Sequence, residues 1–215
     1  MIKTIITAHS GCEGTAPNSM DHIRTGLTCG AEMLEIDVRQ TEDGLLYLSH
    51  DDPQDGPESC VRFGDFLDVL KESPSVRVNC DMKQDGHAAA VMEEAVRRAV
   101  AAQIVFTGSV MSEEPVIRAA GGEFWYSIWD REDFERAVDF LLELPATAGS
   151  RVLNLPYRFV TADNKARLDL LGIGFSCWTA DSEEEIARLL TLGVYNITTR
   201  KPRLALKLRE EIQGR

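Results

Sequence analysis

Two of the four histidines follow short apolar runs that are typical of β-strands. His9 comes directly after Ile2–Ala8, and His50 comes directly after Leu45–Ser49. An unperturbed imidazole has a pKa of roughly 6.5, so two such side chains can divide proton donation and proton acceptance near neutral pH. A single histidine at a strand end is more often a hydrogen-bonded loop residue. Whether this pair is functional therefore depends on the residues that accompany it.

Carboxylates occur at the spacing that places them on one face of a strand. Glu35 and Asp37 are two residues apart in the run Met33–Val38, so their side chains point the same way. Two such carboxylates repel each other unless a cation lies between them, although a solvated sheet edge also fits the pattern. With Asp81 they form a set of hard oxygen ligands, which suits Mg²⁺ or Ca²⁺ better than zinc.

A third polar pattern, Asn79-Cys80-Asp81-Met82-Lys83, alternates in the same way. Lys83 would be a point charge for a phosphate oxygen. A solvent-exposed strand face, or an internal salt bridge, would give the same alternating pattern. Trp178-Thr179 follows another strand-like run, and a tryptophan there is more often a packing residue. The other two histidines, His22 and His87, are expected on the surface.

Together these groups form a set suited to attack on a phosphate ester. A divalent cation held by the carboxylates would neutralise the charge that develops on the phosphate oxygens, and the histidines would move protons. A cation also lets an acidic protein bind an anion, because it inverts the local sign of the charge.

For these residues to meet, the strands before them must end at the same edge of one sheet. The chain alternates strand-like and amphipathic helical patterns. Strands are expected at Ile2–Ala8, Met33–Val38, Leu45–Ser49, Val76–Asp81, Ile104–Thr107, Phe124–Ile128, Val152–Leu155, Ile173–Trp178 and Val194–Thr198. Helices are expected from an Asn18 N-cap to Gly30, from a Ser182 N-cap to Gly193, and over Phe63–Lys71, His87–Ala102, Glu113–Ala120, Glu132–Leu144, Ala162–Leu171 and Arg203–Gln213.

About eight strand–helix units in 215 residues predict a closed (β/α)₈ TIM barrel as a single domain over residues 1–215. The alternative is an open doubly wound sheet. The segment His9-Ser10-Gly11-Cys12-Glu13-Gly14 lacks the glycine-rich phosphate loop of the dinucleotide-binding folds, which favours the barrel.

The connection between Val38 and Leu45 is too short for a helix, and Asp43-Gly44 is a turn signal. A tight reversal centred on Glu42 and Asp43 would set Leu48 across from Asp37 and His50 across from Glu35. A return to a parallel strand would also leave His50 at the rim, and the sequence does not choose between the two.

Charge and cysteine content restrict the partners and the compartment. Lys and Arg number 23 against 35 Asp and Glu, a net charge of −12. Such a chain would repel nucleic acid and anionic membrane surfaces. Its N-terminal apolar run is too short for a signal peptide and no stretch reaches the length of a transmembrane helix, so stable membrane insertion is not expected. Its five cysteines include no Cys-x-x-Cys pair, which favours reduced thiols in a cytoplasm. The oligomeric state is left open.

The motifs together resemble the glycerophosphodiester phosphodiesterase family, which belongs to the phosphatidylinositol-specific phospholipase C-like barrels. The matching segments occur in the family's order over nearly the whole chain. They are His9-Ser10-Gly11, Asn18-Ser19, Gly30-Ala31-Glu32, Glu35-Ile36-Asp37, Thr41-Glu42-Asp43-Gly44, His50-Asp51, Asn79-Cys80-Asp81-Met82-Lys83, Trp178-Thr179 and Gly193-Val194-Tyr195-Asn196-Ile197-Thr198-Thr199.

The resemblance implies a metal-dependent enzyme that cleaves glycerophosphodiesters to glycerol 3-phosphate and an alcohol, in lipid and glycerol metabolism. It implies an acid–base pair of His9 and His50 without saying which is the acid. The metal ligands would be Glu35, Asp37 and Asp81, and the cation Mg²⁺ or Ca²⁺. Lys83 would contact the phosphate group, and Trp178 would line the glycerol side of the site.

Two departures from the family pattern affect the substrate more than the reaction class. Ser10 stands where the family has an arginine, which removes a bidentate phosphate donor. Pro17 stands where the family has a glutamate, and Glu13 is a candidate replacement for that carboxylate. Asp81 replaces a glutamate and shortens one ligand arm. These changes keep two alternatives open: a hydrolase or lyase acting on a different phosphodiester, and a barrel that binds phosphate ligands without catalysis.

Overall fold

The computed structural model describes residues 3–145 and 149–214. Ile2, the expected first residue of the first strand, lies outside them. The described strands are β1 (Ile5–Ala8), β2 (Met33–Gln40), β3 (Leu46–Leu48), β4 (Arg77–Met82), β5 (Ile104–Gly108), β6 (Glu123–Phe124), β7 (Tyr126–Ser127), β8 (Val152–Pro156), β9 (Gly174–Trp178) and β10 (Asn196–Thr199). The described α-helices are α1 (Met20–Thr28), α2 (Phe63–Leu70), α3 (Ala88–Arg97), α4 (Glu114–Ala119), α5 (Phe134–Glu143), α6 (Ala162–Leu170), α7 (Glu183–Leu192) and α8 (Pro202–Gln213).

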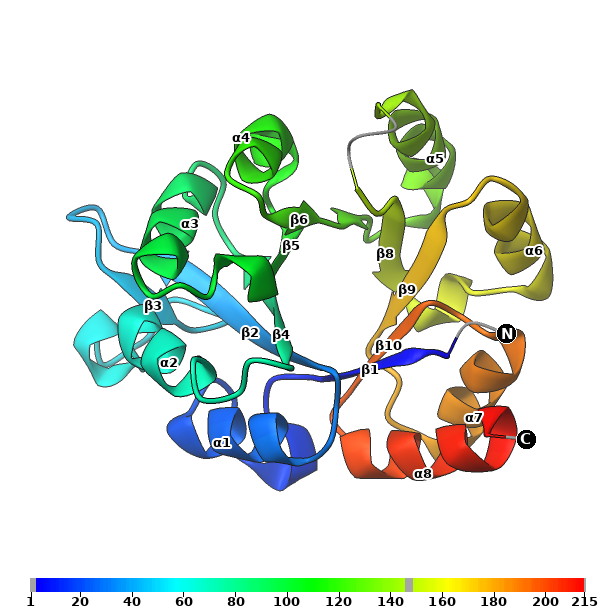
Figure 1. Ribbon diagram of the computed structural model, residues 1–215, viewed down its shortest axis with the longest axis horizontal. Coiled ribbons are helices and arrows are strands. Elements are labelled where there is room, and N and C mark those ends of the chain that lie inside the picture. Colours follow the sequence, from blue (N-terminus) through cyan, green and yellow to red (C-terminus); the bar gives the residue numbers. More distant parts are fainter. Residues whose placement is uncertain (1–2, 146–148, 215) are drawn as a thin grey trace.

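The strands form a parallel barrel with the helices around its outside (Figure 1). The strand order is β6-β5-β4-β2-β1-β10-β9-β8-β7. β6 pairs with β5 and β7 pairs with β8, while Trp125 between them donates its backbone N–H to the Phe106 carbonyl oxygen. The expected strand Phe124–Ile128 is therefore broken, and its two halves bridge β5 and β8. The predicted (β/α)₈ TIM barrel is confirmed.

The β2–β3 connection is a tight reversal, but its register is one residue from that expected. Val38 faces Leu48, so Leu48 does not face Asp37. The loop has three residues instead of two, because Thr41 donates its N–H to the Leu45 carbonyl oxygen at 3.0 Å. Gly44 adopts the left-handed conformation, with φ of 95°, that such loops need. His50 lies just beyond the end of β3.

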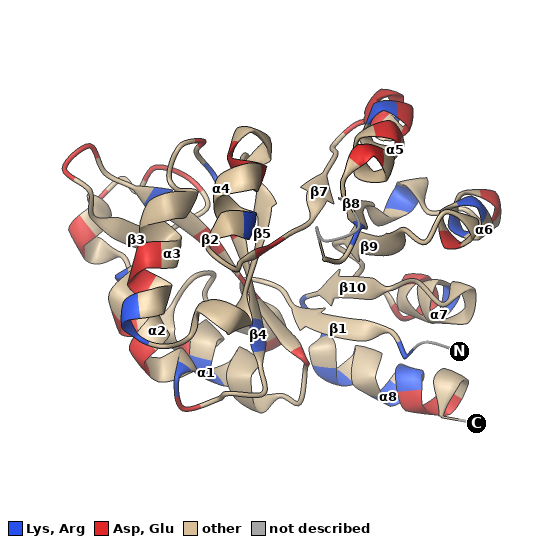
Figure 2. Cartoon of the chain, turned by 45° about the horizontal axis from the view of Figure 1, so that its top comes forward, with Lys and Arg blue, Asp and Glu red and all other residues tan. Residues whose placement is uncertain are grey.

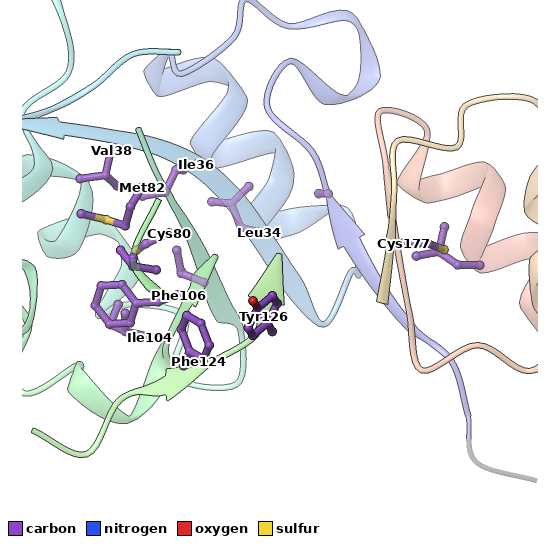
Figure 3. Packing of buried hydrophobic residues seen from close by; sticks show 14 of the residues in the cluster. Leu34, Ile36, Val38, Cys80, Met82, Ile104, Phe106, Phe124, Tyr126 and Cys177 are labelled. Atoms are coloured by element: carbon purple, nitrogen blue, oxygen red, sulfur yellow. The ribbon is translucent and has the colours of Figure 1, made fainter. Parts of the chain in front are cut away.

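The outward-facing strand residues form the core between barrel and helices. Leu34, Ile36 and Val38 of β2 are fully buried and share this core with the apolar residues of β4 and β5 (Figure 3). Inside the barrel, a small separate cluster of Met33, Val105, Trp125 and Val152 closes the floor. The polar strand residues therefore lie above an apolar floor and inside an apolar shell.

Helix α1 begins one residue later than expected. Its N-cap is Ser19, whose Oγ accepts the N–H of His22 at 3.1 Å. The predicted N-cap Asn18 has φ of 54°, and its side chain turns toward β2. Ser182 caps the N-terminus of α7 and Gly193 ends the helix, as predicted, and Gly193 is left-handed.

The surface prediction for His22 is wrong. This α1 residue is completely buried, and neither ring nitrogen has a hydrogen-bond partner in the described residues. His87, at the start of α3, is partly exposed.

Acidic residues lie on helices all around the barrel, interspersed with Lys and Arg (Figure 2). Among the described residues, no helix has the length and apolar character needed to span a membrane.

Candidate active site

The carboxyl ends of the strands surround one cavity of about 350 Å³. All seven residues singled out from the sequence line it: His9, Glu35, Asp37, His50, Asp81, Lys83 and Trp178. The parallel register explains this convergence, since Asp37 lies directly beside Asp81, and Glu35 beside Asn79. Residues paired in this way in parallel strands point to the same side of the sheet.

Three carboxylates form a compact cluster in this cavity. One oxygen from each of Glu35, Asp37 and Asp81 lies within 4.8 Å of the others. Glu35 and Asp37 are buried. Burial, and then the neighbouring charges of Asp37 and Asp81, raise the pKa of Glu35 well above its ordinary value of 4.5. A charged Glu35 is therefore unfavourable in this cluster unless additional positive charge is present.

Lys83 supplies part of that positive charge. Its Nζ lies 2.8 Å from Asp37 Oδ1 and also contacts Asp81. Burial would lower the pKa of this ammonium, but the two aspartates outweigh it and raise the pKa. Burial likewise tends to raise the pKa of Asp37, yet Lys83 and the Asn18 side chain bring it below its usual value. One lysine thus serves two of the three carboxylates.

The donor set fits a divalent cation. Three carboxylate oxygens are the hard ligands that Mg²⁺ and Ca²⁺ select. Lys83 contacts Asp37 and Asp81 and supplies a single positive charge against three carboxylates. A cation there would remove the repulsion between the carboxylates.

The loop after β1 supports the cluster from behind. Ser10 donates its backbone N–H to Glu35 Oε2 at 2.8 Å, and its Oγ accepts the N–H of Asn18 at 3.0 Å. Ser10 is itself buried. This serine therefore links the loop to a carboxylate through its backbone, and its side chain is turned to Asn18.

The two histidines have different surroundings. His9 Nδ1 is 2.9 Å from the Ser10 carbonyl oxygen, which can only accept, so Nδ1 carries the proton. The other nitrogen, Nε2, lies 3.9 Å from Glu35 Oε2. Burial lowers the pKa of His9, which favours the neutral ring. His50 is mostly exposed, and its Nδ1 lies 3.0 Å from Asp51 Oδ1.

A chain of small polar side chains runs around the barrel interior below the cluster. Thr7 Oγ1 donates to Asn196 Oδ1 at 2.7 Å, Asn196 Nδ2 donates to Ser176 Oγ at 3.0 Å, and Ser176 Oγ donates to Asn154 Oδ1 at 2.8 Å. On the opposite side Thr107 Oγ1 bonds Asn79 Oδ1 at 2.8 Å. Most of these residues escaped the sequence interpretation, although Thr7, Ser176 and Asn196 alternate with apolar neighbours.

Gly108 leaves room for Asp81 at the end of β5. A β-carbon at Gly108 would lie 2.5 Å from Asp81 Oδ1 and 2.4 Å from the Met82 carbonyl oxygen. Thr107 Oγ1 lies 3.1 Å from the same Asp81 oxygen. The glycine therefore permits the close packing that fixes one of the candidate ligands.

Trp129 and Arg200 are among the other cavity residues that were missed from the sequence. Trp129 follows β7 and is 47% exposed, and Arg200 follows β10. Their signal was the same as that of His9, a chemically distinctive residue directly after a strand. Glu13 does not line the cavity, and its Oε1 instead accepts the N–H of Arg203 at 3.1 Å.

Comparison with known proteins gives a family match at the N-terminal part of the chain. Residues 9–56 match the glycerophosphoryl diester phosphodiesterase family. This segment contains His9, Glu35, Asp37 and His50. No curated protein matches this sequence.

Solved structures match the fold over the whole chain. One from Agrobacterium tumefaciens, assigned to the glycerophosphoryl diester phosphodiesterases, has a TM-score of 0.85 and 17% identity, with 100% of both chains covered. A glycerophosphodiester phosphodiesterase from Parabacteroides distasonis has a TM-score of 0.77 and 19% identity, with 99% of both chains covered. A phosphodiesterase from Oleispira antarctica, solved with its product sn-glycerol-3-phosphate, has a TM-score of 0.76 and 14% identity, with 95% of this chain and 96% of its own covered.

Proposed function

We propose that the chain is a member of the glycerophosphoryl diester phosphodiesterase family, whose model matches residues 9–56, and that it is a metal-dependent phosphoric diester hydrolase. Its proposed substrates are small glycerophosphodiesters, which it cleaves to glycerol 3-phosphate and an alcohol. The observation that carries this proposal is the clustering of Glu35, Asp37 and Asp81 in the cavity that His9 and His50 also line.

The three carboxylates are the proposed ligands of the divalent cation, Mg²⁺ or Ca²⁺. When bound, such a cation neutralises charge on the phosphate oxygens and lowers the barrier to displacement. The protein's part is to hold three hard oxygens together at the rim, against their mutual repulsion. Lys83, which already lies beside Asp37 and Asp81, is the proposed contact for a phosphate oxygen.

The histidines are the proposed acid–base pair. Hydrolysis needs one group to take a proton from the attacking water molecule, whose oxygen bonds to phosphorus, and another to protonate the alkoxide that leaves as the alcohol. Burial lowers the pKa of His9 and so favours the neutral ring, and with Nδ1 donating to the Ser10 carbonyl oxygen its Nε2 is the nitrogen that can accept a proton. His50 lies at the open side of the cavity, where a leaving alcohol would depart. We therefore assign His9 as the base and His50 as the acid.

Trp178 is the proposed wall of the glycerol side. It ends β9 and lines the cavity between the strand ends and the solvent. An indole face packs against the carbon skeleton of glycerol and excludes water from the reacting phosphate. The Oleispira relative that was solved with sn-glycerol-3-phosphate supports a product of this class.

The proposed reaction belongs to glycerol and lipid metabolism in the cytoplasm. All five cysteines are free. Burial raises the pKa of Cys12 to about 12 and also raises the pKa of Cys80 and Cys177, so these thiols stay protonated and unreactive. Free thiols of this kind suit a reducing compartment.

The test is release of glycerol 3-phosphate from a panel of glycerophosphodiesters, with Mg²⁺, with Ca²⁺ and with EDTA. His50→Ala is the blank, because its exposed side chain can be removed without disturbing the core. His87→Ala is the matched control, since His87 lies outside the cavity. Product that needs metal and disappears only in His50→Ala supports the proposal.

Other outcomes of this assay would indicate a different function for the same cavity. Preferential turnover of an inositol phosphodiester, or a cyclic phosphate as the final product, would indicate a lyase or a hydrolase with another substrate. Thermal stabilisation by glycerol 3-phosphate with no turnover under any metal would indicate a binding protein.

A further inference from the structure

We propose that Arg200 binds the phosphate oxygens of the substrate and of the product. This inference deepens the proposed function and rests on it. Arg200 immediately follows β10, at the rim of the cavity, and its side chain is among those that line it.

The strand register places Arg200 beside His9. Thr7 pairs with Thr198 and Ala8 pairs with Thr199, and the ladder continues because His9 donates its N–H to the Thr199 carbonyl oxygen at 2.9 Å. The next pair in this register is His9 with Arg200. Side chains paired across parallel strands point to the same side, and Thr198, two residues earlier, lines the cavity as well. Arg200 therefore continues the row of residues that faces the reacting groups.

The charges around the cavity leave a role for Arg200. Its lining carries three carboxylates, and Lys83 is held between two of them, Asp37 and Asp81. Arg200 is the one other Lys or Arg among the described residues that line the cavity. A phosphodiester that approaches this acidic rim needs positive charge beyond that of Lys83, and Arg200 supplies it.

Arg200 is held in place but keeps donors free. Its Nη1 lies 2.9 Å from Asp181 Oδ2, and Asp181 Oδ1 accepts the Arg200 backbone N–H at 2.7 Å. Within the described parts of the chain, Nε and Nη2 donate to no other residue. A guanidinium offers parallel donors that match two phosphate oxygens, which an ammonium group cannot do. Asp181 thus positions the side chain, and the remaining donors suit a phosphate group.

Ser10 cannot provide this contact. Its side chain is buried, and its Oγ is occupied by the N–H of Asn18. The loop after β1 therefore offers no cation at the position where the sequence resemblance predicts an arginine. The end of β10, the neighbouring strand, places one at the same rim.

The test compares Arg200→Gln, Arg200→Lys and the control Arg203→Gln, which removes the same charge from an exposed position on α8 outside the cavity. We expect Arg200→Gln to raise KM, and the inhibition constant of glycerol 3-phosphate, roughly ten- to hundred-fold. For Arg200→Lys both constants should lie between those of the wild type and those of Arg200→Gln, because lysine keeps the charge and loses the bidentate geometry. Inhibition by glycerol, which lacks the phosphate, should not change in any variant.

The outcomes separate this inference from the proposed function. If the wild type turns over its substrate and Arg200→Gln leaves KM and the glycerol 3-phosphate inhibition constant unchanged, the inference is wrong and the function stands. If the wild type releases no glycerol 3-phosphate, the proposed function fails. Calorimetric binding of glycerol 3-phosphate then decides: weaker binding by Arg200→Gln than by Arg203→Gln supports the Arg200 contact, and equal or absent binding overturns it.

Discussion

Asn18 and Asp37 hold each other through two hydrogen bonds of opposite direction. Asn18 Nδ2 donates to Asp37 Oδ2 at 2.7 Å, and the Asp37 backbone N–H donates to Asn18 Oδ1 at 3.1 Å. Both residues are buried. This pair ties the segment before α1 to β2, and it orients one of the proposed metal ligands.

The first prediction concerns this pair. Asn18→Ala should weaken metal binding and activity roughly 10–100-fold, because the residues that orient a ligand contribute to affinity by about that factor. Calorimetry would measure the loss of metal affinity, and kcat with saturating Mg²⁺ would measure the loss of activity. Ser19→Ala is the control, since it removes the N-cap of the same helix and costs about 1 kcal/mol of stability without touching Asp37. Equal loss of metal affinity in the two variants would show that Asn18 acts only through stability.

The second prediction concerns the charge of Glu35. The pKa of Glu35 in the folded state lies above its ordinary value of 4.5, so ionising it costs folding free energy as the pH rises through and beyond 4.5. Glu35→Gln should therefore be more stable than the wild type at pH 8 in EDTA. The glutamine still offers an oxygen to the Ser10 N–H.

Metal should reverse this order. A cation at a hundred times its dissociation constant stabilises the wild type by about 2.7 kcal/mol, and Glu35→Gln should gain less because it has lost a ligand charge. Urea unfolding in EDTA and in Mg²⁺ measures both effects. Asp21→Asn, an exposed position on α1, is the control. A wild type that gains no stability from Mg²⁺ or Ca²⁺ would argue against a metal site.

The third prediction concerns His9 as the base. His9→Gln should lower kcat roughly 10²–10⁴-fold, the usual contribution of a general base, with a smaller effect on KM. Steady-state kinetics at saturating metal would measure the change, with His87→Gln as the matched control. An unchanged kcat in His9→Gln would show that another group in the cavity is the base.

The fourth prediction concerns stability and the buried His22. Burial lowers its pKa from 6.5 to about 4 in the folded protein, so the neutral ring is the form that fits the fold. The unfolded chain takes up its proton first as the pH falls, and stability is lost between about pH 6.5 and pH 4. Replacing His22 by leucine removes this loss.

His22→Leu should gain about 2 kcal/mol relative to the wild type when the pH falls from 7.5 to 5. Urea unfolding of both proteins at the two pH values gives the difference, which cancels the titration of all other groups. His87→Leu is the control at a partly exposed histidine. A difference that does not change with pH would mean that the pKa of His22 is the same in the folded and in the unfolded protein.

Some features of the protein follow from its sequence alone. The alternation of Glu35 with Asp37, and of Asn79 with Asp81 and Lys83, places each group on one strand face because the period of a strand is two. The sequence also predicts the order of strand and helix that makes a barrel, and the position of His9 and His50 directly after their strands. These properties are local, so the chain encodes them over a few residues.

Other features depend on the tertiary structure, because they involve residues far apart in the chain. The sequence predicts Asn18 as the N-cap of α1. In the structure the N-cap is Ser19, and the Asn18 side chain binds Asp37. His22 reads as a surface residue, yet the packing of α1 against the barrel buries it completely. Arg200 has no local signature beyond its place after a strand, and only the pairing of β10 with β1 sets it beside His9. Strand register and helix packing decide these positions because they are fixed by long-range contacts, which a local pattern does not specify.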